Sequence, residues 1–96
     1  MQKKNVIFIL SDQHRFCDVG YMGNAEVQTP FLDQIAAEGA NFINTYSPCP
    51  LCVPARGSIF TGLHALKHKA AANDLPIDAD LPSLATAFSG DGYQTA

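Results

Sequence analysis

Charged residues are scarce in this sequence. Only 16% of the 96 residues are Asp, Glu, Lys or Arg, and the formal net charge is -3. Because basic residues are not in excess, the charge gives no reason to expect a nucleic acid or an anionic membrane as a partner. Hydrophobic residues make up 47% of the chain, which predicts a folded core rather than disorder, and the length suits one small domain.

Cysteines and long apolar runs are scarce as well. The three cysteines are an odd number, which does not suit the closed disulfide framework of a small secreted protein. The apolar run at residues 6–10 follows Lys3 and Lys4 and is too short for a signal-peptide core or a membrane span. We therefore expect a cytoplasmic protein in a reducing compartment.

The first half of the chain predicts a strand, a helix and a second strand. Residues 6–10 are β-branched or large and apolar, as in a parallel strand buried on both faces. Thr29 as N-cap and Pro30 at the first helical position predict a helix that ends at Gly39. Residues 40–46 predict the second strand. This order predicts a right-handed crossover, and hence an α/β fold with a parallel sheet flanked by helices.

The helical spacing of Phe31, Leu32 and Ile35 predicts that these side chains belong to the core. Two more helices are expected, over residues 54–62 and 82–89, and another strand is expected to begin near the end of the sequence. Because a domain rarely stops at the start of a parallel strand, we expect the 96 residues to be a truncated piece of a larger domain.

A polar stretch follows directly after the first predicted strand. Asp12 lies in it, next to Gln13 and His14. Ligands of open α/β sheets bind beyond the carboxyl ends of the strands. Asp12 is therefore placed where chemistry would occur, with an ordinary loop residue as the alternative.

The segment around Cys52 carries the densest set of chemically useful residues. Cys52 precedes a predicted helix whose first turn contains Arg56. Backbone N–H groups and the helix dipole favour anions at such a place, and a guanidinium adds bidentate recognition of tetrahedral oxyanions. The segment suits a nucleophile that attacks a sulfate or phosphate ester.

Cys52-Val53-Pro54-Ala55-Arg56 resembles the C-x-P-x-R sequence of the type I sulfatases, which is read by the formylglycine-generating enzyme. Further stretches are similar to the same family in the same order, namely residues 5–12, 23–30, 57–62 and 81–96. The resemblance therefore covers nearly the whole chain.

The resemblance implies an alkaline-phosphatase-like α/β fold, with residues 1–96 as the amino-terminal part of a sulfatase catalytic domain. It implies that Cys52 is oxidised to formylglycine, whose hydrate is the nucleophile, and that Arg56 steadies that hydrate. Asp12, Gln13 and the modified Cys52 would bind a divalent cation, usually calcium, with manganese or zinc as alternatives. The expected substrate is a small-molecule sulfate ester.

One departure from the family pattern bears on the substrate. Many relatives carry two adjacent carboxylates where this chain has Asp12 and Gln13. This feature resembles the branch of phosphonate monoester hydrolases and choline sulfatases, so a phosphonate or phosphate ester is the alternative substrate. Asn73 resembles an asparagine that contacts the substrate in that branch, and His68 is expected to bind substrate at the rim of the pocket.

Two other interpretations stay open. Cys49 and Cys52 form a C-x-x-C pair, which is also typical of a dithiol redox module, and a metal-binding module could use them with His64 and His68. In addition, the resemblance places further metal ligands outside these residues, so the isolated piece is expected to be inactive.

Overall fold

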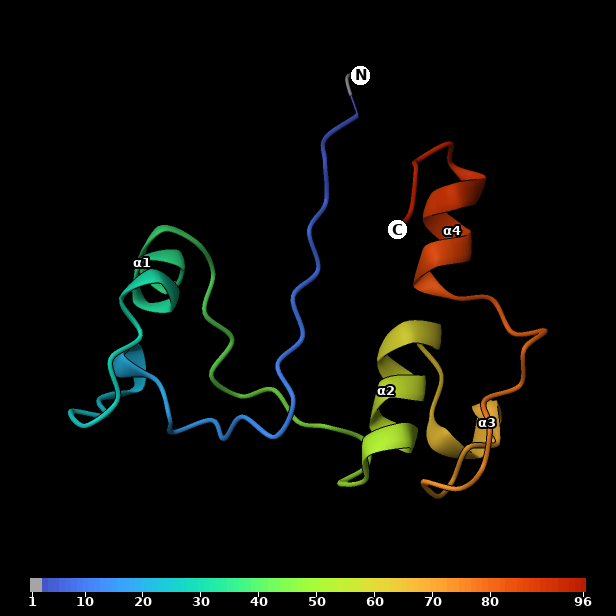
Figure 1. Cartoon of the computed structure of the whole chain (residues 1–96), viewed down its shortest axis with the longest axis horizontal. Coiled ribbons are helices and arrows are strands. Elements are labelled where there is room, and N and C mark those ends of the chain that lie inside the picture. Colours follow the sequence, from blue (N-terminus) through green and yellow to red (C-terminus); the bar gives the residue numbers. More distant parts are fainter. Residues whose placement is uncertain (1–2) are drawn as a thin grey trace. The chain divides into compact units, whose positions relative to one another are not determined.

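The computed structural model describes residues 3–96, which form short helices joined by long irregular segments (Figure 1). The chain divides into two compact units, Met1–Ile43 and Asn44–Ala96, which are described separately below. The first unit holds η1 (Gly20–Met22) and α1 (Pro30–Glu38). The second holds three helices, which are α2 (Cys52–Thr61), α3 (Ala65–His68) and α4 (Leu84–Gly90).

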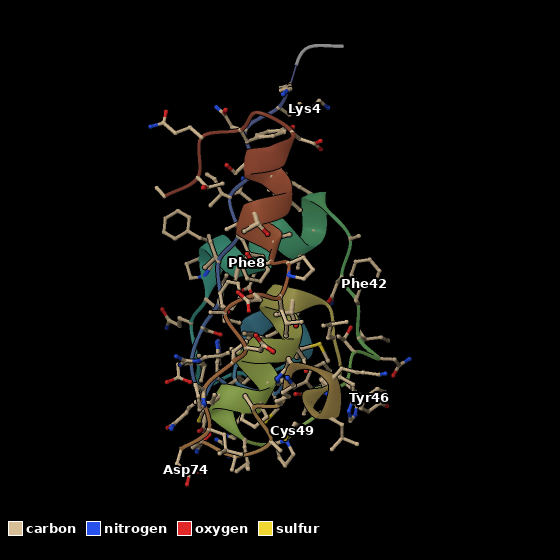
Figure 2. All side chains as sticks on the ribbon, turned by 90° about the vertical axis from the view of Figure 1, so that its right-hand side faces the viewer. Lys4, Phe8, Phe42, Tyr46, Cys49 and Asp74 are labelled. Atoms are coloured by element: carbon tan, nitrogen blue, oxygen red, sulfur yellow. The ribbon has the colours of Figure 1, made fainter. Side chains whose placement is uncertain are left out.

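The strands expected from the sequence are absent from residues 3–96, and this is a correction to the predicted parallel sheet. Every side chain of residues 6–10 is exposed, with Ile7 at 83% and Ile9 at 80%. Phe42 and Tyr46, from the second expected strand, are also exposed, and Figure 2 shows their side chains away from the ribbon. A strand exists only with a hydrogen-bonded neighbour, so an apolar β-branched pattern alone does not produce one.

The α1 helix confirms the predicted start and end. Thr29 is its N-cap, Pro30 is its first residue and Gly39 is its C-cap. The Thr29 hydroxyl does not cap a helix N–H, however. It accepts a hydrogen bond from the Gly20 N–H at 2.8 Å and donates to the Asp33 carboxylate at 2.9 Å. The same carboxylate accepts the Tyr21 N–H at 2.8 Å, and in this way Asp33 joins α1 to η1.

The expected core face of α1 is exposed, which corrects the sequence-based assignment. Phe31 is 79% exposed, Ile35 63% and Leu32 42%. The helix contacts η1 within the first unit, where Val19 is buried with 4% of its surface exposed. A helix of this amphipathic kind buries its apolar side only where a second layer lies against it.

The α2 helix begins two positions earlier than expected, at Cys52, and ends at Gly62 as predicted. Pro54 is tolerated in the first turn because the N–H groups there have no intrahelical acceptor. At the other end, Gly62 has a left-handed φ of 70° and its N–H donates to the Ser58 carbonyl. The Thr61 hydroxyl donates to the Gly57 carbonyl at 2.6 Å, which reinforces the last turn.

The two remaining helices both contribute contacts to α2. The sequence interpretation missed α3, which has only four residues, too few for a periodic pattern. The α4 helix lies close to the expected position and begins with a capping box: the Ser83 side chain accepts the Thr86 N–H, and the Thr86 hydroxyl accepts the Ser83 N–H at 2.7 Å. Among residues 3–96, no helix combines the length and the apolar character that crossing a membrane requires.

The left-handed cap of α2 generates a stability prediction. A side chain at Gly62 would force an L-residue into the left-handed region, so Gly62→Ala should lower the free energy of unfolding of the full chain by about 1 kcal/mol. Gly90→Ala is the matched control, because it lies in α4 with no atom within 4 Å of an added Cβ. Urea denaturation of both variants measures the difference, and equal effects would contradict the role of the cap.

A second prediction concerns an ion pair in the second unit. The Lys69 ammonium donates to the Asp78 carboxylate at 3.1 Å, and this bond, with help from the Asp80 N–H, lowers the pKa of Asp78. A lowered pKa adds stability above the unfolded pKa, and this stability is lost as the pH falls through the folded pKa. In an NMR titration, Lys69→Met should raise the pKa of Asp78, whereas Lys67→Met should not. An unchanged pKa in Lys69→Met would refute this account.

Candidate active site

The candidate nucleophile lies at the start of α2. Cys52 is the first residue of the helix and is exposed. Arg56 follows four positions later and is also exposed. Residues at this spacing lie on the same face of a helix. The helix therefore places Cys52 and Arg56 on one face near the end that favours anions, and their joint action stays a prediction.

Asn73 reaches the same turn of the helix. Its side-chain oxygen accepts the Val53 N–H at 3.0 Å. Val53 directly follows Cys52, so this bond satisfies one of the backbone donors that a helix N-terminus leaves without an intrahelical acceptor. Asn73 thus lies beside the candidate nucleophile, as a cap supplied from a segment far along the chain. Its expected role in substrate binding stays a prediction.

His68 lies in the interior, whereas the sequence placed it at the rim of a pocket. It is 0% exposed, and both ring nitrogens have partners. Nε2 lies 3.1 Å from the Pro54 carbonyl and 3.2 Å from the Ser58 hydroxyl, and Nδ1 accepts the Ala70 N–H at 3.3 Å. Because Nδ1 is an acceptor, Nε2 carries the proton and donates it. The substrate-binding role expected of His68 stays a prediction.

The three cysteines are free thiols in the structure. Cys52 and Cys17 are exposed, and Cys49 is half-buried. Figure 2 places Cys49 in the loop that precedes α2, where its N–H lies 3.4 Å from the Ser47 hydroxyl. The exposed position of Cys52 is compatible both with modification of its sulfur and with the dithiol alternative.

The candidate metal ligands belong to the other unit. Asp12 and Gln13 are both exposed, and Gln13 has a positive φ of 53°, in a region that residues other than glycine rarely adopt. Strained backbone of this kind is concentrated at functional sites. The positive φ of Gln13 therefore favours a functional role for this turn. The expected approach of Asp12 to Cys52 stays a prediction.

The loop after Gln13 is organised around Asp18. Arg15 donates from Nε at 2.7 Å and from Nη2 at 3.1 Å to the two carboxylate oxygens, and this pair lowers the pKa of Asp18 and raises that of Arg15. The His14 ring lies 2.8 Å from the Asp18 carbonyl. The Asp18 carboxylate is thus paired with a guanidinium in the same loop. This pairing does not favour Asp18 as a ligand for a metal cation.

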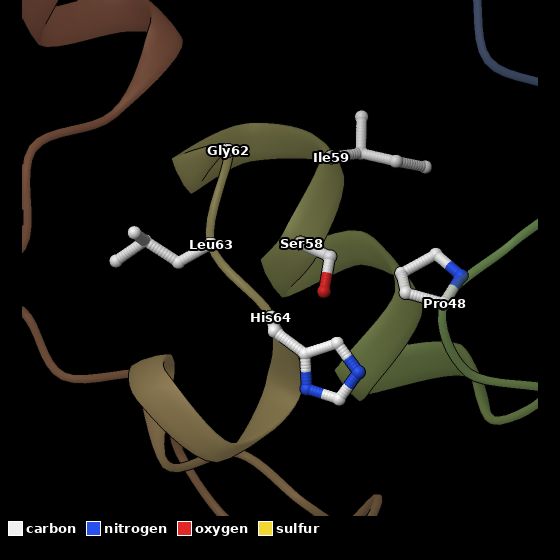
Figure 3. Close-up of a pocket in the computed structure, with 6 residues that line it drawn as sticks. All are labelled: Pro48, Ser58, Ile59, Gly62, Leu63 and His64. Atoms are coloured by element: carbon white, nitrogen blue, oxygen red, sulfur yellow. The ribbon is translucent and has the colours of Figure 1, made fainter.

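A shallow apolar hollow of about 280 Å³ lies on the second unit (Figure 3). Ser58 and Ile59 of α2 line it, together with the turn after that helix and Pro48 before it. Cys52 and Arg56 do not line this hollow. Among residues 3–96, no group of three or more His, Cys, Asp or Glu side chains could hold a metal ion. Asp12 and Gln13 as metal ligands therefore stay a prediction.

The sequence interpretation missed one structural role that the geometry makes plain. Gly57 faces the His68 ring so closely that an added Cβ would lie 2.7 Å from the ring carbon Cε1. The sequence signal was a glycine inside a predicted helix, which usually has a packing reason. Gly57 is the position at which the His68 ring packs against α2.

Comparison with known proteins finds relatives that cover nearly the whole chain. An ulvan-active sulfatase of Formosa agariphila is 39% identical over 94 residues, which cover 98% of this chain and 18% of the relative. The multifunctional alkaline phosphatase superfamily protein PehA of Trinickia caryophylli is 37% identical over 101 residues, with 100% of this chain and 20% of the relative covered. An arylsulfatase of Clostridium perfringens is 36% identical, with 97% and 20% covered.

The chain therefore spans about a fifth of the length of these curated relatives. No solved structure matches it. The sulfatase family profile matches residues 4–96, which is nearly every residue. Together with the C-x-P-x-R segment at the start of α2, this match shows that the chain belongs to the sulfatase family.

Proposed function

We propose that these residues supply the nucleophile and part of the cation site of a sulfuric ester hydrolase with an alkaline-phosphatase-like α/β fold. The observation that carries this proposal is the position of Cys52, exposed at the first residue of α2 with Arg56 one turn later. The helix end favours a tetrahedral anion, and the guanidinium adds charge and directional hydrogen bonds.

In this proposal Cys52 is oxidised to formylglycine by the formylglycine-generating enzyme, which is the expected protein partner. The exposed thiol is compatible with such chemistry. Asn73 caps the neighbouring N–H of Val53 and keeps the first turn in place while its amide group stays close to the reacting centre. Arg56 orients the hydrated aldehyde and the ester oxygens.

Asp12 and Gln13 are the proposed ligands for a divalent cation, with calcium as the first choice. Carboxylate and amide oxygens are hard donors, which calcium prefers. These two residues fit part of its shell, and the formylglycine made from Cys52 would add another oxygen. A bound cation would stabilise the negative charge on the ester oxygens. A cytoplasmic location also belongs to the proposal.

A phosphonate or phosphate ester is the second candidate substrate class. It is favoured by the amide at Gln13, where a second carboxylate would otherwise stand, and by the likeness to PehA. A site with one negative charge fewer repels a doubly charged phosphate monoester less than a site with two carboxylates would. Comparison of kcat/KM for an aryl sulfate and for a phenyl phosphonate monoester distinguishes the two classes.

The identity of the nucleophile gives the first functional prediction. In a chain of the relatives' full length, Cys52→Ala should abolish aryl-sulfate hydrolysis, whereas the control Cys49→Ala should retain most of it. Peptide mass spectrometry of protein co-expressed with the generating enzyme should show that the Cys52 peptide has lost about 18 Da, as expected for conversion of a thiol to an aldehyde. Equal loss of activity in both variants would support the dithiol pair instead.

The cation site gives a second prediction, with a readout apart from activity. Asp12→Asn in the same full-length chain should weaken calcium binding by more than about tenfold, because it removes the charged ligand. Titration calorimetry measures the affinity, and Asp80→Asn serves as a control carboxylate from an exposed loop. Unchanged calcium affinity in Asp12→Asn would remove Asp12 from the proposed site.

A further inference from the structure

The most deeply buried polar side chain in residues 3–96 has no part in the function proposed above. His68 is the one charged or polar residue of the described chain that is buried, and its surface is 0% exposed. Its α3 helix contacts α2. A buried polar side chain is stable only with its hydrogen-bonding groups satisfied, and His68 meets this requirement through contacts to the nucleophile helix.

The hydrogen bonds of the His68 Nε2 atom reach two successive turns of α2. Nε2 donates toward the Pro54 carbonyl at 3.1 Å, with the Ser58 hydroxyl 3.2 Å away. Pro54 lies two positions after Cys52 and is itself fully buried. The ring therefore reaches the same turn that carries the candidate nucleophile, and fixes it from the side that faces the interior.

The chain that follows His68 returns to the same turn. Nδ1 accepts the Ala70 N–H at 3.3 Å, which bends the chain back, and Asn73 then accepts the Val53 N–H at 3.0 Å. The N–H of Val53 and the carbonyl of Pro54 belong to neighbouring residues. One short segment, residues 68–73, thus holds a donor and an acceptor of the first turn of α2 at once.

Gly57 makes the close approach of the ring feasible. An ideal Cβ at this position would lie 2.7 Å from Cε1, 2.9 Å from Nε2 and 3.0 Å from Nδ1 of His68. No real Cβ approaches a ring so closely, and the His68 side chain has no room to retreat in a buried position. Gly57 and His68 are therefore complementary parts of one contact.

We propose that His68 is a positioning residue: its ring, received by Gly57, fixes the first turn of α2 and so sets the orientation of Cys52 and Arg56 toward the ester. This inference rests on the proposed function of Cys52. It replaces the expected contact of His68 with substrate by an action through the Pro54 carbonyl. A misplacement of about 1 Å in reacting groups is sufficient to lower a rate about 100-fold.

Two conservative variants separate the contacts of the ring. The Gln side-chain amide places its nitrogen near the position of Nε2, so His68→Gln retains the donor to Pro54. Asn places its oxygen near Nδ1, so His68→Asn retains only the acceptor for the Ala70 N–H. In the full-length enzyme, we expect kcat per formylglycine to fall about 100-fold in His68→Asn and less than about tenfold in His68→Gln, with KM nearly unchanged.

Three outcomes of this comparison would overturn the proposal. Equal kcat values for the Gln and Asn variants would show that the Pro54 contact is not the important one. A raised KM with unchanged kcat would make His68 a substrate-binding residue. A lower melting temperature with unchanged kcat per formylglycine would leave it a purely structural residue. Formylglycine content, measured by peptide mass, corrects each rate for incomplete modification.

A double-mutant cycle tests the fit of Gly57 and His68 without any need for activity. Gly57→Ala should lower the melting temperature strongly in the wild-type background and much less in His68→Ala, where the ring is absent. Gly90→Ala, with no atom near its added Cβ, should have the same small effect in both backgrounds. Additive effects of Gly57→Ala and His68→Ala would refute the contact.

The proposed function of Cys52 and the positioning role of His68 are refuted by different results. If Cys52→Ala retains hydrolysis, the proposed function is wrong, while the coupling between Gly57 and His68 is still measured by the melting temperatures. If Cys52→Ala is inactive and His68→Asn retains full kcat, the proposed function stands and the positioning role of His68 is wrong.

Discussion

The ring of His68 and the backbone carbonyl of Pro54 make a hydrogen bond of 3.1 Å on which the arrangement of α2 and α3 depends. The ring is wholly buried, so loss of this bond would leave a polar group without a partner in the interior. Gly57 provides the space for the ring, and the turn at Ala70 provides its second bond. These contacts join the start of α2 to the segment that follows the helix.

This arrangement fixes from its buried side the turn that carries the proposed nucleophile. Cys52 is exposed, while Pro54, two positions later, is fully buried. Side chains on rigid helix ends lose little freedom when a substrate binds, which favours precise attack geometry. The first turn of α2 thus has one side exposed to solvent, where the proposed anion would bind, and one side packed against the rest of its unit.

Local signals in the sequence predicted the three longer helices, but not the four-residue α3 and not the absence of strands among residues 3–96. Helix ends depend on interactions between residues that are close in the sequence. The ends predicted from Thr29, Pro30 and Gly62 are therefore found in the structure. The pattern at residues 6–10 requires a partner strand from elsewhere, and no strand is formed among residues 3–96. The contact between His68 and Gly57 could not be predicted from the sequence either. The spacing of residues along a helix does not show which of its faces an aromatic ring from another segment will pack against.

The exposed apolar run at residues 6–10 has a consequence for the self-association of the polypeptide. It joins β-branched and aromatic residues without a charge or a proline, the composition from which intermolecular cross-β stacks are built. Because the run is exposed among residues 3–96, its apolar side chains are available for contact with a second copy of the chain. The run is therefore a place at which copies of the polypeptide can associate with one another.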